Sequence, residues 1–316
     1  MVLVMSLILF SCFLNFTHNE VNSFNESSIN RLNINTVHEP IEVLNDTAFV
    51  LYGFEGEGTK EDPYIIENYY IESFGFLSNA IYVTGTTAHF IIRNCYMVAE
   101  YLGINVHAVA SNTALIFNNT ITSGAFTGCG IGASSVSGCS IINNTCFGHS
   151  TSIHTNEANN ITISGNSAGN AIYHGIGIRY TSSSKITDNI IQNCSMFGVA
   201  IVEGASWFNL IYNNDFIDNG NAGTYNIDNE SFGNITSQAY DEGNYNTWHN
   251  EETETGNKWS DYSGKGDYLI DGPSGSSDKY PEKYTSQSGS IVLFYLGILS
   301  ILIAGIVILR RKKNSK

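Results

Sequence analysis

The sequence predicts an all-β protein: a right-handed parallel β-helix of about six or seven coils with end caps, followed by one C-terminal transmembrane helix. Asn and aliphatic residues recur together about every 22–25 residues through the middle of the chain. The chain contains 30 Gly but only 14% charged residues, a balance that favours β-structure with many turns over a helical bundle. An uncharged apolar run lies near the C-terminus, at residues 291–309.

The repeat is visible as three columns of residues. The first is the Asn column: Asn94, Asn119, Asn144, Asn166, Asn189 and Asn214. The second lies three residues before each Asn: Ile91, Ile116, Ile141, Ile163, Ile186 and Ile211. The third lies thirteen residues before each Asn: Ile81, Val106, Ile131, Ile153, Ile176 and Ile201. Since the last two columns are entirely aliphatic and β-branched, we expect them to face inward and to stack from coil to coil.

This period distinguishes the β-helix from other repeat folds. Each coil holds two or three short strands and cannot bury its inward face alone, so stacking creates the core. Leucine-rich repeats have a similar period but need Leu columns and a helical arc, whereas a propeller blade needs about 40 residues. Asn at a recurring turn can bond its stacked neighbour and tolerates left-handed backbone angles.

The two ends of such a solenoid expose strand edges and need caps. Upstream, GEGTKEDPYIIENYYI is a Gly-rich turn that leads into an apolar strand, and downstream the segments QAYDEGNYNTWHN, GNKWSDYSGKGDY and SSDKYP are rich in Trp, Tyr, Gly and Asp. The expected organisation is a signal peptide at 1–22, a polar linker at 23–38, an N-terminal cap at 39–75, repeats at 76–235, a C-terminal cap at 236–285, a linker at 286–290, a transmembrane helix at 291–309 and a cytoplasmic tail at 310–316.

Both termini resemble targeting segments. A helix over Ile291 to Leu309 rises by about 28 Å, enough to cross the apolar core of a bilayer. The basic cluster RRKK follows at once and is typical of the cytoplasmic side, which places the C-terminus inside and the bulk of the chain outside. The apolar run from Val2 to Leu14 has the length of a signal-peptide core, although it lacks a basic start. We therefore expect a single-pass membrane protein at the cell surface.

The charge balance excludes one class of partner. The chain carries 14 Lys and Arg against 29 Asp and Glu. Five of the basic residues lie in the last seven positions, so the remainder, with 9 basic and 29 acidic residues, has a net charge of −20. Nucleic acid binding needs Lys and Arg for its phosphates and is not expected. Solubility outside the cell explains the acidity most simply, and divalent cations or basic partners are the alternative.

Cysteines and glycosylation motifs fit an exported chain. Cys12 lies in the signal region, and five Cys remain, with no C-x-x-C pair that would indicate a zinc ribbon. We expect them to be small buried core residues, with one disulfide among Cys129, Cys139 and Cys146 as the alternative. N-glycosylation sequons occur at nine positions: Asn15, Asn25, Asn45, Asn118, Asn143, Asn160, Asn193, Asn229 and Asn234.

The chain resembles the NosD-type β-helix proteins, also described as carbohydrate-binding and sugar-hydrolase β-helix repeats. The resemblance runs from about Glu39 to Tyr284 and is carried by the repeat, by GEGTKEDPYIIE before it and by GNKWSDY after it. It implies a parallel β-helix, as in many membrane-anchored archaeal surface proteins. Members of the family often carry an acidic Gly-Asp-rich insertion after WSDY, which implies a Ca²⁺ loop. Here that segment is short, and the residues that could build the site are Asp261, Asp267 and Asp271; a hydrogen-bonded cap is the alternative.

The family name also implies copper delivery to a nitrous oxide reductase. Copper sites need clustered His, Cys or Met, whereas the eight His of this chain are scattered. His107 and His154 could share one outward face, but two coils, or about 10 Å, would separate them. We therefore expect no copper site and no cofactor other than Ca²⁺.

Candidate catalytic and ligand-binding residues follow from the fold. A sugar hydrolase needs two carboxylates about 5–10 Å apart, and the candidates are Asp188, Glu203 and Asp215. An Asp beside a turn Asn is more commonly a turn residue. For ligand binding the candidates are three aromatic residues and one basic residue: Trp207, Trp248, Trp259 and Arg179.

Three functions remain open at this point. The first is a non-catalytic module that binds glycans or surface partners, and it is favoured because the sequence contains no recognisable catalytic motif. The second is a polysaccharide hydrolase or lyase, and the third is a copper-handling protein. The fold cannot choose among them, because function belongs to the site.

Overall fold

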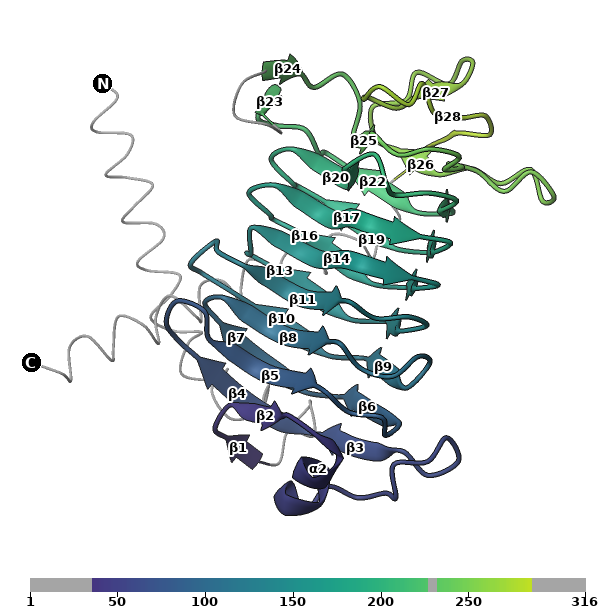
Figure 1. The fold of residues 1–316 in the computed structure, drawn as a ribbon. Helices are drawn as coiled ribbons and strands as arrows, with labels where there is room; N and C mark the ends of the chain where they lie inside the picture. The colour runs from purple at the N-terminus through teal and green to yellow at the C-terminus, as the bar shows by residue number, and fades with distance from the viewer. Residues whose placement is uncertain (1–35, 227–231, 286–316) are drawn as a thin grey trace, which may run out of the picture.

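The computed structural model describes residues 36–226 and 232–285. They form an all-β parallel solenoid of the right-handed type with about nine turns and nearly no helix. Figure 1 shows the turns stacked as successive rungs, from helix α2 (Asp46–Tyr52) at one end to the C-terminal cap at the other. The expected parallel β-helix is confirmed, but the expected number of coils, six or seven, was too low.

Three parallel sheets, named A, B and C here, build the solenoid. Sheet A is formed by β1 (Thr36–His38), β4 (Tyr69–Ser73), β7 (Tyr96–Ala99), β10 (Thr120–Thr122), β13 (Thr145–Phe147), β16 (Ser167–Gly169), β19 (Ile190–Gln192), β22 (Asp215–Ile217), β26 (Lys258–Trp259) and β29 (Glu282–Lys283). Sheet B is formed by β2 (Ile41–Val43), β5 (Asn79–Thr84), β8 (Leu102–His107), β11 (Cys129–Ser134), β14 (Thr151–Asn159), β17 (His174–Ser182), β20 (Phe197–Val202) and β25 (Ala239–Asp241). Sheet C is formed by β3 (Tyr64–Glu67), β6 (Phe90–Arg93), β9 (Ala114–Phe117), β12 (Ser140–Ile142), β15 (Thr162–Ser164), β18 (Lys185–Thr187) and β21 (Leu210–Tyr212).

The additional turns come from the segments that were expected to be caps. Strands β1 to β4 already pair with the first repeats, and β25, β26 and β29 extend sheets A and B beyond the last repeat. Strands β26 and β29 carry no Ile of the predicted columns, but their backbones still complete the ladder of sheet A. Two antiparallel hairpins, β23 (Thr224–Asn226) with β24 (Phe232–Asn234) and β27 (Tyr268–Leu269) with β28 (Ser277–Asp278), are added at the C-terminal end.

The core is a set of stacked aliphatic rows, as expected, but with two changes of register. In sheet B, Ile104 continues the row of Ile81 and Ile131, whereas Val106 and Ile201 belong to the next inward row. Alternate residues of a strand share a face, so this shift of two positions leaves all of them buried. In sheet C the shift is one position: Ile92 is buried in the row of Ile66 and Ile116, and Ile91 faces outward.

A buried ladder of Asn side chains fills the corner between sheets C and A. It runs through Asn119, Asn144, Asn166, Asn189, Asn214 and Asn257. Each Oδ1 from Asn144 onward accepts the backbone N–H of the preceding member, and each Nδ2 donates to an Ile carbonyl of the preceding coil. Asn94 is not a member. Its φ is 54°, and it lies in the exposed turn position of Asn118.

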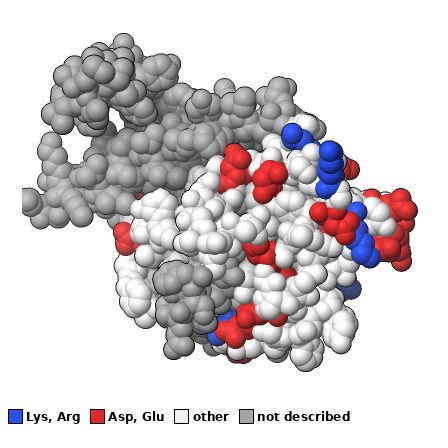
Figure 2. Space-filling model, turned by 90° about the horizontal axis from the view of Figure 1, so that it is seen from above, with Lys and Arg blue, Asp and Glu red and all other residues white. Residues whose placement is uncertain are grey.

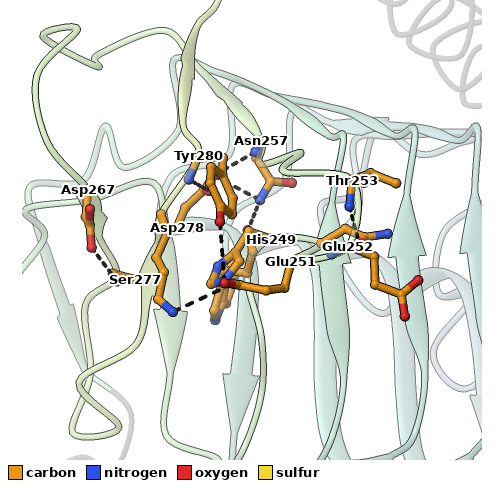
Figure 3. A network of polar contacts seen from close by, with 12 residues as sticks. His249, Glu251, Glu252, Thr253, Asn257, Asp267, Ser277, Asp278 and Tyr280 are labelled. Carbon is orange, nitrogen blue, oxygen red and sulfur yellow. Dashed lines mark hydrogen bonds and ion pairs between the residues drawn. The ribbon is translucent and has the colours of Figure 1, made fainter.

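Polar side chains attach both caps to the solenoid through hydrogen bonds. Asn45 caps helix α2 by accepting from the Ala48 N–H at 3.1 Å, and the Asp46 carboxylate accepts from Thr86, Thr87 and Ala88 of the first coil. At the other end, Asp278 accepts from the backbone N–H of Asn257 and from the Trp259 indole. Figure 3 shows the surrounding network, in which Glu251 accepts from His249 at 3.0 Å and from the Tyr280 hydroxyl at 3.4 Å.

The five cysteines between residues 95 and 194 are free thiols, and all except Cys129 are buried. The expectation of small buried core residues is confirmed for four of the five, and the structure joins no two of Cys129, Cys139 and Cys146 in a disulfide. Within the described ranges the structure contains no helix that is both long enough and apolar enough to span a bilayer. The predicted signal peptide, transmembrane helix and basic tail lie in residues 1–35 and 286–316, outside the described residues.

Candidate binding groove

Two columns of left-handed residues flank the corner where each turn passes from sheet B to sheet C. The sheet B column is Gly85, Ala108, Ser135, Glu157, Tyr180 and Glu203. The sheet C column is Gly138, Asn160, Ser183, Phe208 and Tyr245. All of these residues have φ between 43° and 72°. The same left-handed backbone conformation recurs from coil to coil, so the fold imposes it. The residue type at the position, in contrast, varies between coils.

Large side chains occupy these columns only toward the C-terminal end. The first coils use Gly, Ala, Ser and Asn, which suit left-handed backbone or add little bulk. The later coils use Glu157, Tyr180, Glu203, Phe208 and Tyr245. A left-handed conformation costs a residue with a side chain roughly 1–2 kcal/mol. Backbone strain of this kind is concentrated at functional sites, so the C-terminal half of this corner is the strongest candidate for a site.

An open groove lies between the two columns at this place. We call it the corner groove, and it is lined by Glu157, Ala158, Asn159, Tyr180, Ser182, Ala205 and Trp207. Trp207 is 46% exposed and Tyr180 is 39% exposed, so both rings face solvent. The Trp207 indole N–H donates to the carbonyl of Gly204 at 2.8 Å, which fixes the orientation of the ring. The groove therefore offers two aromatic rings together with amide, hydroxyl and carboxylate groups.

Charged neighbours hold Tyr180 in place. Its hydroxyl donates to Glu203 at 3.2 Å, and Arg179 forms an ion pair with the same carboxylate at 3.0 Å. The Arg179 guanidinium also lies over the Tyr180 ring, 5.1 Å from its centroid. Glu242 in turn accepts from the backbone N–H of Glu203 at 2.8 Å. Glu203 therefore contacts both the Arg179 guanidinium and the Tyr180 hydroxyl, and the Glu242 carboxylate is bonded to the Glu203 backbone.

A second aromatic pair continues the corner toward the C-terminal cap. The rings of Phe208 and Tyr245 stack with centroids 5.2 Å apart and an angle of 9°, although both remain largely exposed. The next residues of the two loops anchor them, because Asn209 donates to Asn246 at 3.0 Å and to the buried carbonyl of Thr181 at 2.8 Å. Tyr180, Trp207, Phe208 and Tyr245 form what we call the aromatic strip.

The predicted catalytic carboxylates have different partners, and Glu203 lies apart from the other two. Asp188 lies at the corner between sheets C and A, where it accepts from Asn213 at 2.5 Å and from Ser164 at 3.3 Å. Asp215 lies in β22 of sheet A and is 3.7 Å from Lys258. Burial raises the pKa of Asp215, an effect that Lys258 opposes. Glu203 alone lies beside the corner groove.

The predicted Ca²⁺ ligands accept hydrogen bonds from different groups. Asp261 accepts from Gln238 and Tyr268, Asp267 accepts from Ser277, and Asp271 accepts from Thr236 and Ser237. Each carboxylate therefore has hydrogen-bond partners of its own. Across residues 36–226 and 232–285, no three His, Cys, Asp or Glu side chains are grouped as a metal site requires.

The aromatic candidates divide into one exposed and two buried residues. Trp248 and Trp259 have no exposed surface, and their indole nitrogens donate to Asp241 and Asp278. They form the core of the C-terminal cap and cannot present a ring to a ligand. Trp207 is exposed in the corner groove, whereas Arg179, the basic candidate, contacts Glu203 and the ring of Tyr180.

Sequence reasoning missed Glu157, Tyr180 and Phe208, and with Phe208 its stacking on Tyr245. A signal for the first two was present, because Glu157, Tyr180 and Glu203 follow one another at the repeat spacing and therefore stack in one column. No sequence signal marked this column as left-handed. The pair of Phe208 and Tyr245 was hidden because 37 residues separate them, a distance outside the repeat period.

Fold and groove together define a parallel β-solenoid with an open aromatic groove at one corner. The sequence matches the model of the family described as "Periplasmic copper-binding protein (NosD)" over residues 24–264, and the chain belongs to this family. No curated protein matches the sequence.

Three solved structures are similar in shape. The A-module of the mannuronan C-5 epimerase AlgE4 of Azotobacter vinelandii is 9% identical, with a TM-score of 0.30 over 71% of this chain and 82% of that one. The A-module of the epimerase AlgE6 of the same organism is 10% identical, with a TM-score of 0.35 over 80% and 81%. QnrB1, a plasmid-mediated fluoroquinolone resistance protein, is 13% identical, with a TM-score of 0.23 over 59% and 83%. All three TM-scores lie below 0.5, so these similarities assign no activity to the chain.

The described residues do not fit the copper site that the family description implies. Burial raises the pKa of Cys95, Cys129, Cys139 and Cys194 to about 12, so these thiols stay protonated, whereas copper is bound by thiolates. His154 aligns with Gly132 of the neighbouring strand and not with the column of His107, so the two rings lie in different rows.

Proposed function

We propose that this protein is a non-catalytic glycan-binding module on the outer surface of a cell. The observation that carries the proposal is the pairing of Trp207 and Tyr180 in one open groove with Asn159, Ser182 and Glu157. The apolar face of a pyranose stacks on aromatic rings, and its hydroxyls bond to amide, hydroxyl and carboxylate groups. A groove that combines both kinds of group at the surface suits a sugar ligand.

The arrangement of carboxylates supports binding over hydrolysis. A glycoside hydrolase needs two carboxyl groups directed at one glycosidic bond. Asp188 and Asp215 lie in other parts of the coil, and the Glu203 side chain is held by Arg179 and Tyr180. Glu203 therefore lies at a different corner of the coil from Asp188 and Asp215.

The proposed location follows from the sequence. The apolar run at 291–309 and the basic residues after it are typical of a single membrane anchor with a cytoplasmic tail. The acidic remainder of the chain suits a domain exposed outside the cell. Figure 2 shows more acidic than basic side chains on the end of the solenoid that carries the C-terminal cap, and most of that face bears neither.

A glycan array probed with the full chain in lipid nanodiscs tests the proposal. We expect saturable binding to at least one glycan class, and loss of binding in the Trp207→Ala variant. Tyr173→Ala is the matched control, because Tyr173 is a similarly exposed ring (50%) that directly precedes β17, at the end of that strand away from the groove. Turnover of a bound polysaccharide, or binding that is indifferent to Trp207→Ala, would contradict the proposal.

A further inference from the structure

We infer that the aromatic strip takes an internal stretch of a linear polysaccharide, aligned with the solenoid axis, whose sugars are uncharged or carry amino groups. The inference rests on the proposed function and specifies its ligand. It is drawn from the order of the aromatic rings along the axis, the openness of the groove and the charges beside it.

The rings of the strip follow one another from coil to coil. Ser183, next to the groove, donates its N–H to the carbonyl of Trp207 at 2.9 Å, and Phe208 donates to the carbonyl of Asn244 at 3.3 Å. Tyr180, Trp207 and Tyr245 therefore belong to three consecutive coils. Neighbouring strands lie about 4.8 Å apart, a distance comparable to the length of one pyranose unit. A linear sugar chain along the axis would thus meet a ring at nearly every sugar.

The form of the site favours a segment from within a chain over a chain end. The corner groove is open to solvent and is not an enclosed cavity. Beyond it, toward the C-terminal cap, the strip ends on Tyr245, which is 77% exposed. A chain can enter and leave along this line, whereas recognition of a terminal sugar needs a pocket that surrounds it.

The rings are held in position before a ligand arrives. Tyr180 is fixed by Glu203 and by the guanidinium of Arg179. Trp207 is fixed by its bond to Gly204, and Phe208 by its stack on Tyr245. Fixed rings lose little conformational entropy on binding, so even weak contacts repeated along a chain can add up to a measurable affinity.

The charges beside the strip select the class of sugar. Glu157 lines the groove, Glu203 is paired with Arg179, and Glu242 accepts from the backbone N–H of Glu203. A uronate or sulfated chain would be repelled by this excess of carboxylates, because bringing like charges together weakens binding. Neutral sugars meet no such penalty, and amino sugars would be attracted to Glu157.

The test is a length series with the full chain in nanodiscs. The probes are cello-oligosaccharides (neutral), chitosan oligomers (cationic) and oligogalacturonates (anionic), each from one to eight units. We expect affinity for the first two to rise with each added unit and to level off after several units, with oligogalacturonates at least about tenfold weaker at equal length. Tyr245→Ala should make the plateau begin at a shorter length and lower the plateau affinity about tenfold. Tyr173→Ala should change neither.

One further variant tests the charge assignment, and the possible outcomes distinguish an error in the ligand class from a failure of glycan binding itself. Glu157→Gln should weaken chitosan binding and strengthen oligogalacturonate binding while leaving cello-oligosaccharides unchanged. If a monosaccharide binds as tightly as an octasaccharide, the extended site is wrong while glycan binding itself stands. If oligogalacturonates bind best, the charge assignment is wrong. If none of the three series binds and the glycan array is also negative, the proposed function fails as a whole.

Discussion

Asn214 donates its side-chain N–H to Asn257 at 2.9 Å although 43 residues separate the two in sequence. The long segment between them contains strands of the C-terminal cap, yet the chain returns to the same corner and extends the ladder by one member. The Oδ1 of Asn257 also accepts the backbone N–H of Asn214 at 3.1 Å. The ladder therefore joins the C-terminal cap to the repeats through side chains that have no access to water.

Removing one member of this ladder should destabilise the protein strongly. In Asn144→Ala, the backbone N–H of Asn119 and the carbonyl of Ile116 lose their buried partner. Each buried group left without a partner costs about 1–3 kcal/mol, so we expect a loss of roughly 3 kcal/mol in unfolding free energy. Chemical denaturation measures this loss. Asn105→Ala, on the outward face of sheet B, is the control and should cost less than about 1 kcal/mol. Equal losses in the two variants would count against a structural ladder.

Substitution of Trp259 should lower the stability of the protein, whereas substitution of Trp207 should affect binding and leave stability almost unchanged. The Trp259 ring is stacked between Phe216 and Tyr268, with centroids 4.0 Å and 3.9 Å away. Trp259→Ala leaves a large cavity in the cap, and we expect a loss of about 3–5 kcal/mol in unfolding free energy. Trp207→Ala should change stability by less than about 0.5 kcal/mol, because its ring is exposed. Thermal melts of both variants provide the comparison, and a stable Trp259→Ala protein would refute the assignment of this ring to the cap core.

Two buried His should make the protein sensitive to acid. Burial lowers the pKa of His149 to about 4 and that of His174 to about 3, from a usual value of 6.5. Below pH 6.5 the unfolded chain takes up protons that the folded chain refuses, so stability is complete above pH 6.5 and falls toward pH 4. Each group can remove up to about 1.4 kcal/mol per pH unit within that window.

Denaturation midpoints between pH 7 and pH 4.5 test this expectation. His149→Gln should lose less stability over that range than the unmodified protein, even if it is less stable at pH 7. His107→Gln, which changes a partly exposed ring on the outward face of sheet B, should follow the unmodified protein. An identical pH profile for all three proteins would mean that His149 is not held neutral by the fold.

The thiols should be unreactive in the folded protein. Burial raises the pKa of Cys139 and Cys194 to about 12, and both side chains are buried. Maleimide labelling at pH 7 should therefore be slow for the native protein and complete after denaturation without reductant. Mass spectrometry counts the labels. Labels that appear only after reduction would reveal a disulfide that the structure does not contain.

The fold could be predicted from the sequence because the inward-facing residues recur in each coil. Ile116, Ile141 and Ile163 stack as expected. The exact register was not accessible, because a shift of two residues, as for Val106, keeps the same side chains inward. The number of turns was underestimated, because strands such as β26 and β29 pair through their backbones and carry no Ile column.

The site was only partly accessible to sequence reasoning. Trp207 and Arg179 were found because their residue types suit a ligand. Trp248 and Trp259 share the same chemistry and proved to be buried, because composition does not reveal on which side of a coil a ring lies. Tyr180 was missed because its role depends on a left-handed backbone angle, which becomes visible only when the coils are stacked.

The most direct test of the account uses intrinsic fluorescence. The chain has three Trp, of which Trp248 and Trp259 have no exposed surface, whereas Trp207 lies in the corner groove. A saccharide that binds there should change Trp fluorescence in a saturable way in the full-length protein. We predict that this change disappears in Trp207→Phe and persists in Tyr173→Ala. A saturable change that survives Trp207→Phe would place the ligand elsewhere and contradict the assignment of the groove.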